Sequence, residues 1–267
     1  MAIRANDTNL ILGPCPFRSI PSGVEELEML RGRAGLQRAV GSGFRSLLYY
    51  DTLSGLEEDL VHYASLRTWI YFYATLDPRF PQMERGVRRA AVDERIAAVR
   101  LLPGLHHYEL DAPEVDDLMA AAQSERVPVN LMARIFDDRV APQYVQQTVP
   151  KPEHVAAFLM RHSGVKIALS MFYFIELRAL ELDWHALPHV YVDFGCSKPN
   201  VASLDALEKV FPRARSLFGT GAPFYYWAGS RLGLEGAEMS VETKRAIMVD
   251  NAPVSYTHLT LPTNREV

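Results

Sequence analysis

Four residues at the ends of predicted strands have the chemistry to bind a small anion. Asn130 and Arg134 lie an even number of residues apart on one strand, so their side chains project to the same side. Arg100 ends the strand before them, and Asp193 lies in a later one. Because a guanidinium fork matches a carboxylate bidentately, Arg134, assisted by Arg100 and Asn130, is predicted to hold a small carboxylate.

An internal ion pair is the alternative for these arginines, with Asp193, Asp137 or Asp138 as the partner, because buried charges commonly pair within a protein. Groups for proton transfer are also present. Asp193 and His107 are the candidate catalytic acid and base, and His107 follows His106 in a loop after a strand. Most histidines in exposed loops have no such role, so the competing interpretation of both is an ordinary surface position.

Eight apolar segments alternate with eight helical ones along the chain. The predicted strands are Thr8–Leu12, Gln37–Phe44, Thr68–Thr75, Ile96–Pro103, Val127–Arg134, Val165–Phe172, Val190–Cys196 and Arg215–Pro223. The predicted helices are Val24–Ala34, Leu56–Leu66, Gln82–Glu94, Pro113–Glu125, Pro152–His162, Ile175–Ala186, Leu204–Phe211 and Val241–Val249. This rhythm predicts an α/β protein, a single (β/α)₈ TIM barrel whose active face carries the strand ends listed above. An open doubly wound sheet is the rival, but its glycine-rich phosphate loop has no counterpart at Gly13-Pro14-Cys15-Pro16.

Composition limits the class of protein. The 267 residues are 48% hydrophobic and 22% charged, and the net charge of −4 is spread without a basic run, which argues against a nucleic-acid partner. Cys15 and Cys196 lack the C-x-x-C spacing of a zinc or redox site, which favours a reduced, cytoplasmic setting. The start is too polar for a signal peptide, and no apolar run is long enough to span a membrane.

The last residues are predicted to lie outside the domain. Residues 254–263, with the sequence V-S-Y-T-H-L-T-L-P-T, resemble the in-frame translation of a transposon-end adapter used in sequencing libraries. On that interpretation the barrel comprises residues 1–253, its C-terminus is truncated, and residues 254–267 form a non-native tail that should pack poorly.

Three motifs resemble the amidohydrolase-related family, which includes metal-dependent decarboxylases. They are Asp7-x-Asn9-x-x-x-Gly13, Pro128-Val129 at the start of the fifth strand, and Leu217 to Phe224, which is similar to the family pattern L-F-G-T-D-x-P-F. The resemblance extends in strand order over almost the whole chain. It implies the TIM-barrel fold and an activity in the hydrolase or carbon–carbon lyase class.

The same resemblance implies that the metal ligands of the family have been replaced. The positions of its two strand histidines, its two later histidines and its metal-binding aspartate hold Asn9, Ile11, Met132, Met171 and Gly221. These side chains suit neither zinc nor manganese, so we expect no metal or other cofactor there. A metal site made of Asp193 with His106 or His107 stays open as an alternative. Asn9 and Thr220 are expected to contribute to ligand binding instead.

Function follows from the resemblance. The expected protein is a hydrolase or decarboxylase that acts on a small carboxylate without the metal site of the family. The alternative is a catalytically silent barrel that binds a small anion or serves as an assembly subunit, and a third option is metal-free acid–base catalysis by Asp193 and His107. Aromatic loop residues fit either a ligand pocket or the interface of a homo-oligomer: Phe17, Tyr49, Tyr50, Tyr108 and Phe224–Trp227.

Overall fold

Eight parallel strands form one sheet in sequential order in the computed structural model, which describes residues 3–139, 141–195, 204, 211–252 and 256. Backbone hydrogen bonds from Thr8 N to Phe218 O (2.7 Å) and from Ile11 N to Ala222 O (2.9 Å) bring the last strand against the first. The sheet is therefore a nearly closed barrel, as predicted. Its strands are β1 (Ala5–Leu12), β2 (Leu36–Gly43), β3 (Ile70–Thr75), β4 (Ile96–Leu101), β5 (Val129–Met132), β6 (Ile167–Ser170), β7 (Val190–Asp193) and β8 (Ser216–Leu217).

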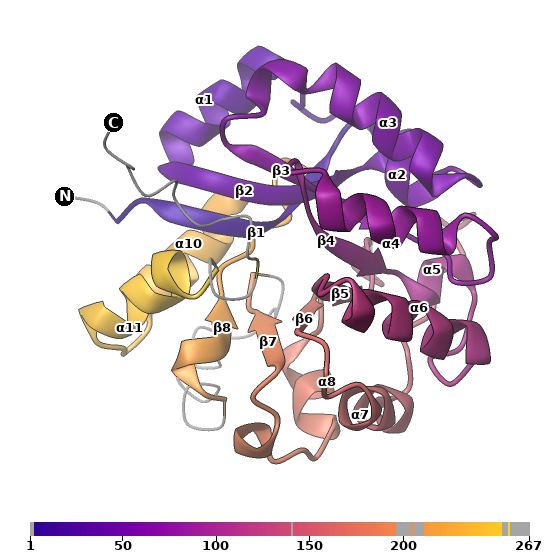
Figure 1. Ribbon diagram of the computed structural model, residues 1–267. Coiled ribbons are helices and arrows are strands. Elements are labelled where there is room, and N and C mark those ends of the chain that lie inside the picture. The colour runs from indigo at the N-terminus through magenta and orange to yellow at the C-terminus, as the bar shows by residue number, and fades with distance from the viewer. Residues whose placement is uncertain (1–2, 140, 196–203, 205–210, 253–255, 257–267) are drawn as a thin grey trace, which may run out of the picture.

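Helices surround the barrel (Figure 1). The α-helices are α1 (Val24–Ala34), α2 (Phe44–Leu48), α3 (Thr52–His62), α4 (Met83–Val92), α5 (Pro103–His106), α6 (Pro113–Ser124), α7 (Pro152–Arg161), α8 (Phe174–Ala179), α10 (Trp227–Gly236) and α11 (Val241–Arg245). Short 3₁₀ turns occur at Ala64–Leu66, Trp184–Ala186 and Arg213–Arg215, and the π-helical turn η4 (Ala246–Asp250) continues α11. Of the helix predicted at 204–211, only the two end residues are among those described.

One helix was missed from the sequence. The segment Trp227–Gly236 forms α10, although Gly229, Gly233 and Gly236 give it a poor intrinsic helix propensity. Tertiary packing of Ala228, Arg231 and Leu234, which are buried, stabilises it instead.

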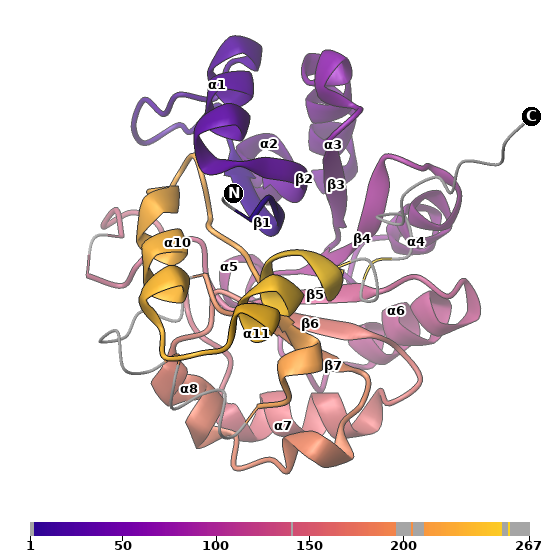
Figure 2. The same ribbon diagram turned by 90° about the vertical axis from the view of Figure 1, so that its left-hand side faces the viewer.

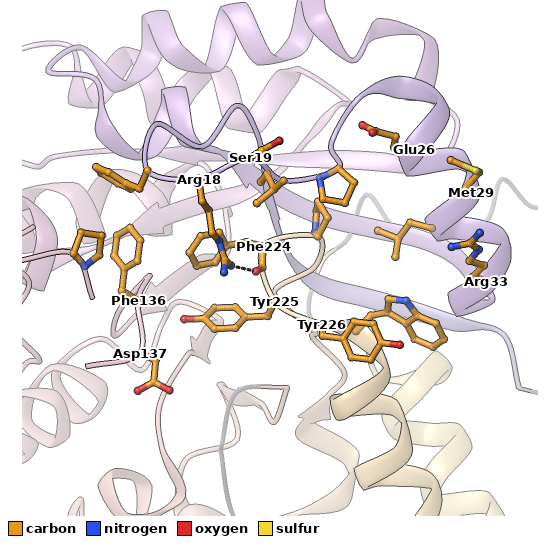
Figure 3. Close-up of a pocket in the computed structure, with 17 residues that line it drawn as sticks. Arg18, Ser19, Glu26, Met29, Arg33, Phe136, Asp137, Phe224, Tyr225 and Tyr226 are labelled. Atoms are coloured by element: carbon orange, nitrogen blue, oxygen red, sulfur yellow. Dashed lines mark hydrogen bonds between the residues drawn. The ribbon is translucent and has the colours of Figure 1, made fainter. Parts of the chain in front are cut away.

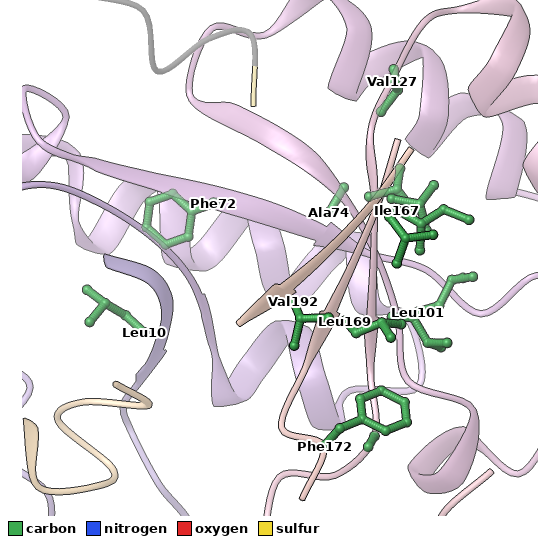
Figure 4. Close-up of a cluster of buried hydrophobic side chains, with 14 of the residues drawn as sticks. Leu10, Phe72, Ala74, Leu101, Val127, Ile167, Leu169, Phe172 and Val192 are labelled. Atoms are coloured by element: carbon green, nitrogen blue, oxygen red, sulfur yellow. The ribbon is translucent and has the colours of Figure 1, made fainter. Parts of the chain in front are cut away.

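Successive side chains of a strand point alternately outward, to the apolar core beneath the helices, and inward, to the barrel interior. The outward side chains of β4, β6 and β7 pack against the helices in the main core, which includes Leu101, Ile167, Leu169 and Val192 (Figure 4). The intervening residues face inward, and they include the buried polar residues Arg100, Asn130, Ser170 and Asp193.

The N-terminal end of the barrel is closed. In Figure 2, which views the barrel from this end, α11 lies across it. Below it an apolar floor contains Val40, Tyr73, Tyr191 and Leu217 together with Tyr256. Tyr256 is 1% exposed and its hydroxyl lies 2.8 Å from that of Tyr73. It is the one residue of 254–267 that the structure describes, and its burial differs from the expected poor packing of that tail.

Within the described residues, no helix has the length and apolar character needed to cross a membrane.

Candidate active site in the barrel interior

A buried guanidinium group occupies the centre of the barrel. Arg100, on β4, donates hydrogen bonds to Asn9 Oδ1 (2.8 Å), Asn130 Oδ1 (2.8 Å) and Ser42 Oγ (3.1 Å). The guanidinium carbon lies 3.8 Å from the ring centroid of Tyr73. Burial lowers the pKa of Arg100, because it disfavours the charged form of the guanidinium, and the three direct hydrogen-bond acceptors are neutral. The sequence prediction that Arg100, Asn130 and Asn9 belong to one site is consistent with this geometry.

Two buried carboxyl groups lie beside this cluster. The pKa of Asp193, on β7, is raised to about 7, because burial and the charge of Asp7 outweigh the opposing hydrogen bond from Gly195 N (2.8 Å). Burial also raises the pKa of Asp7 to about 6, although Thr220 Oγ1 donates to it at 2.6 Å. Gly219 is needed for the close approach of β8 to β7, because a Cβ atom there would lie 2.4 Å from Asp193. Asp193 therefore sits in the pH range where a carboxyl can both donate and accept a proton.

An apolar cluster separates this polar layer from solvent at the C-terminal ends of the strands. Ile11, Leu102 and Met132 each follow a member of the polar layer by two residues, so they lie one level above it on the same side. They pack with Met171 and Phe224, and all five are at most 6% exposed. The mouth of the barrel is thus filled by hydrophobic side chains.

Arg134 belongs to a different cluster. Its Nη1 donates to Glu176 Oε2 (2.8 Å) and to Met171 O (3.1 Å), its Nη2 donates to Glu176 Oε1, and its guanidinium lies 3.8 Å from the Tyr173 ring centroid. Burial lowers the pKa of Arg134, but hydrogen bonds and the charge of Glu176 outweigh this, and the pKa is raised. The internal ion pair foreseen for Arg134 exists, but its main partner is Glu176. Asp138 is farther away, at 3.7 Å.

The two loop histidines lie apart from the polar layer. His107 is exposed and has a left-handed backbone with φ 55°, whereas Asp193 is fully buried. The His106 ring contacts Leu47 O at 3.0 Å, and burial lowers its pKa. The structure therefore does not bring Asp193 and His107 together as an acid–base pair.

A cavity of about 940 Å³ lies outside the barrel interior, between α1 and the segment that connects β8 to α10 (Figure 3). None of the polar-layer residues lines it. Phe136 and Phe224, which help to fill the mouth, form part of its wall. This cavity and the buried carboxyl groups with raised pKa values are thus separate features of the molecule.

The model of the amidohydrolase family matches residues 62–253, which is most of the chain. The chain belongs to the amidohydrolase family. No curated protein sequence matches it. Solved structures share the barrel of this amidohydrolase-family protein at low sequence identity. One is 5-carboxyvanillate decarboxylase from Sphingomonas paucimobilis, with a TM-score of 0.73, 13% identity, and coverage of 96% of this chain and 99% of that one.

Two further structures extend the comparison. 2,6-Dihydroxybenzoate decarboxylase from Rhizobium has a TM-score of 0.69 at 13% identity and covers 96% of this chain and 99% of its own. 5-Carboxyvanillate decarboxylase from Novosphingobium aromaticivorans, complexed with manganese and a nitrobenzoic acid, has a TM-score of 0.72 at 11% identity. The match covers 95% of this chain and 96% of that one. At these identities the likeness shows the fold.

The positions assigned to the metal by resemblance do not fit a divalent cation. Ile11, Met132 and Met171 pack together in the apolar cluster, as expected of neighbouring positions at one mouth. Gly221 donates its backbone N–H to Asn9 O at 2.7 Å. Its φ is +69°, and a Cβ atom there would lie 2.7 Å from the Tyr225 ring, so an aspartate would adopt a strained backbone conformation and would displace that ring.

Elsewhere in the described part of the chain, one group of potential ligands lies within 4.8 Å of one another: Glu109, Asp111 and His154. Both carboxylates are exposed, and exposed acidic groups of this kind are common without a bound ion. This surface cluster shares no residue with the polar layer.

Several members of the site escaped the sequence analysis. Asp7 was noted only within a motif, and Ser42, Tyr73 and Ser170 were not noted at all; Ser170 Oγ accepts a hydrogen bond from Asn130 Nδ2 at 2.8 Å. The inward parity of β2, β3 and β6 was the available signal, because Ser42, Tyr73 and Ser170 alternate with core residues on those strands. Glu176 carried no such signal, since it lies in the first turn of a short helix.

Proposed function

We propose that this protein is a hydrolase or decarboxylase of the amidohydrolase family that acts on a small carboxylate without a metal ion at the barrel mouth. Asp193 carries the proposal. It is a buried carboxyl group with a pKa of about 7, in the same interior layer as a cationic fork. The decarboxylases with a similar fold act on substituted benzoates, which are small aromatic carboxylates.

Each group in the layer has a role in this proposal. Arg100 binds the substrate carboxylate, and Asn9, Asn130 and Ser42 orient the guanidinium plane. Burial keeps the pKa of Asp193 high, and the charge of Asp7, which accepts a hydrogen bond from Thr220, adds to this effect. In a decarboxylation, protonated Asp193 transfers its proton to the carbon that loses CO₂, and the electrons of the broken bond form the new C–H bond. The carboxylate-binding role passes from Arg134 to Arg100, because Glu176 already neutralises Arg134.

A silent barrel is the second candidate, and the filled mouth favours it. A substrate reaches Arg100 only if the apolar cluster around Met132 and Phe224 moves. A barrel in which that cluster never opens would hold Arg100 and Asp193 as buried structural groups, and it would serve as a binding or assembly subunit.

The test combines ligand binding and turnover. We expect 2,6-dihydroxybenzoate or 5-carboxyvanillate to raise the melting temperature of the wild type and of Arg134→Lys, but not of Arg100→Lys, which keeps the charge and loses the fork. Ser42→Ala, which removes one hydrogen-bond acceptor of Arg100, is the milder variant, and it should reduce the ligand-induced rise in melting temperature. Chromatographic detection of the decarboxylated product separates an enzyme from a silent barrel. An unshifted wild type would support the silent scaffold.

Metal content is measured on the same preparation. Elemental analysis should give well below one zinc or manganese per chain, and chelation should leave the ligand-induced shift unchanged. A stoichiometric tightly bound metal that chelation removes together with binding would contradict the metal-free part of the proposal.

A further inference from the structure

We propose that the groove between α1 and the β8–α10 connection is a second ligand site, which binds an extended carboxylate with an apolar body. This groove is the cavity of about 940 Å³ described above, at the upper end of the usual range for small-molecule sites. It is independent of the Arg100 layer, because the two share no residue.

One wall of the groove is held in place without a ligand. The Phe224 ring lies 5.5 Å from Phe136 and 5.0 Å from Tyr225, and the Arg18 guanidinium lies 4.2 Å from the Phe224 centroid. Tyr225 Oη also donates to Ile135 O at 2.8 Å. A wall fixed by these contacts loses little conformational entropy when a ligand binds.

The opposite wall and the rim expose apolar surface. Met29 on α1 is 53% exposed, and Tyr226 is 79% exposed. Figure 3 shows Met29 and Tyr226 on opposite sides of the groove. A ligand with an apolar body lying between them would remove this surface from water, which is favourable in proportion to the area covered.

The charges of the groove favour an anion. Arg18 and Arg33 form no ion pair within the described residues. Of the two acidic residues, Asp137 pairs with Arg139 at 2.9 Å, whereas Glu26 accepts a hydrogen bond from the neutral Gly23 N at 2.7 Å and keeps its charge. Two arginine charges against the one charge of Glu26 leave the groove with a net charge of +1.

The separation of these groups sets the ligand shape. In Figure 3, Arg33 lies at one end of the groove, Phe136 at the other, and Arg18 with Phe224 between them. Arg18 already donates to Phe224 O, which leaves Arg33 as the free guanidinium. A carboxylate at Arg33 with an acyl or aryl body along Tyr226 and Phe224 fits this order.

Dansylated undecanoic acid, whose fluorescence rises in an apolar site, tests the proposal by direct titration, with its methyl ester as the uncharged control. We expect Arg33→Gln to weaken binding of the acid about fivefold, as for a surface ion pair, and to leave binding of the ester unchanged. Arg88→Gln is the matched control, because Arg88 is an exposed arginine on α4 outside the groove.

A second pair of variants tests the apolar wall. Met29→Glu should weaken binding of the acid by roughly tenfold, because the substitution removes an apolar contact and adds a negative charge that repels the carboxylate. Met160→Glu, at a methionine that is 57% exposed on α7, should have no effect. Ser42→Ala should also leave probe binding unchanged, which separates this site from the barrel interior. Equal affinities across all variants, tighter binding of the ester than of the acid, or a dimer that Met29→Glu dissociates would overturn the proposal.

Discussion

Two buried arginines in this protein differ in one respect that decides their use. Arg100 and Arg134 each lie 3.8 Å from the centroid of a tyrosine ring, and each is at most 1% exposed. Arg100 donates to neutral amide and hydroxyl groups, whereas Arg134 donates to the carboxylate of Glu176. The comparison teaches that burial alone does not mark a binding arginine, because only Arg100 keeps a positive charge that no direct carboxylate partner neutralises.

Removal of the central cation should have the largest effect. Arg100→Met leaves three buried acceptors without their guanidinium donor and removes the positive charge that stabilises ionised Asp193. We therefore expect a loss of about 3–5 kcal/mol in the free energy of unfolding. Arg134→Met should cost less, because Glu176 is 23% exposed and regains water. Urea denaturation of both variants measures the difference, and a larger loss for Arg134→Met would reverse the comparison.

The Arg134 ion pair is tested from its other side. Glu176→Gln keeps the shape of the side chain and leaves the buried Arg134 with Asp138, at 3.7 Å, as its remaining carboxylate neighbour among the described residues. We expect a loss of about 2 kcal/mol by urea denaturation, with unchanged binding of small carboxylates at Arg100. If that variant instead gained a carboxylate-dependent thermal shift, Arg134 would be a ligand-binding residue once its partner is removed.

The dependence of stability on pH should report Asp193. The pKa of Asp193 is about 7 in the folded protein, whereas a solvent-exposed aspartate, as in the unfolded chain, has a pKa of 3.8. Between these two pH values the folded state therefore binds more protons than the unfolded state. Stability contributed by Asp193 is therefore fully present in acid and is lost as the pH rises through this window. Asp7, with a pKa of about 6, acts in the same direction.

Asp193→Asn removes one of these two contributions. The stability of the variant should fall less steeply between about pH 4 and 7 than that of the wild type, by at most about 1.4 kcal/mol per pH unit. Urea denaturation across this pH range gives both slopes. Parallel slopes would mean that Asp193 ionises in the folded protein as it does in the unfolded chain, and would remove it as the proton donor.

The smallest effect is expected at His107. His107→Asn keeps a residue that tolerates the left-handed backbone, and the exposed imidazole makes no contact with the polar layer, so the free energy of unfolding should change by less than about 0.5 kcal/mol. Product formation should also be unchanged. A large loss of turnover in a stably folded His107→Asn would place this loop in the active site after all.

Periodicity was sufficient for the architecture. All eight strands overlap the predicted segments, and α1 has its predicted bounds. The spacing of apolar residues predicts these elements, because it places those residues on the one face of each strand or helix that is buried. The predicted eighth strand shortens to two residues, because Gly219 and Gly221 follow it at close contacts with β7 and Tyr225. The helix α10 was missed because its three glycines lower the helix propensity of a segment that tertiary packing stabilises.

Residue types and parity on single strands also determined much of the candidate site. Arg100, Asn130, Asn9, Asp193 and Thr220 were assigned from the sequence to the ligand-binding or catalytic region, and the structure places all five in the barrel interior. What only the tertiary structure decided is which charges meet. Glu176, more than forty residues from Arg134, neutralises one arginine, while Asn9, from β1, leaves the charge of the other uncompensated. Side-chain pairing across strands depends on the register and closure of the barrel, which local sequence patterns do not specify.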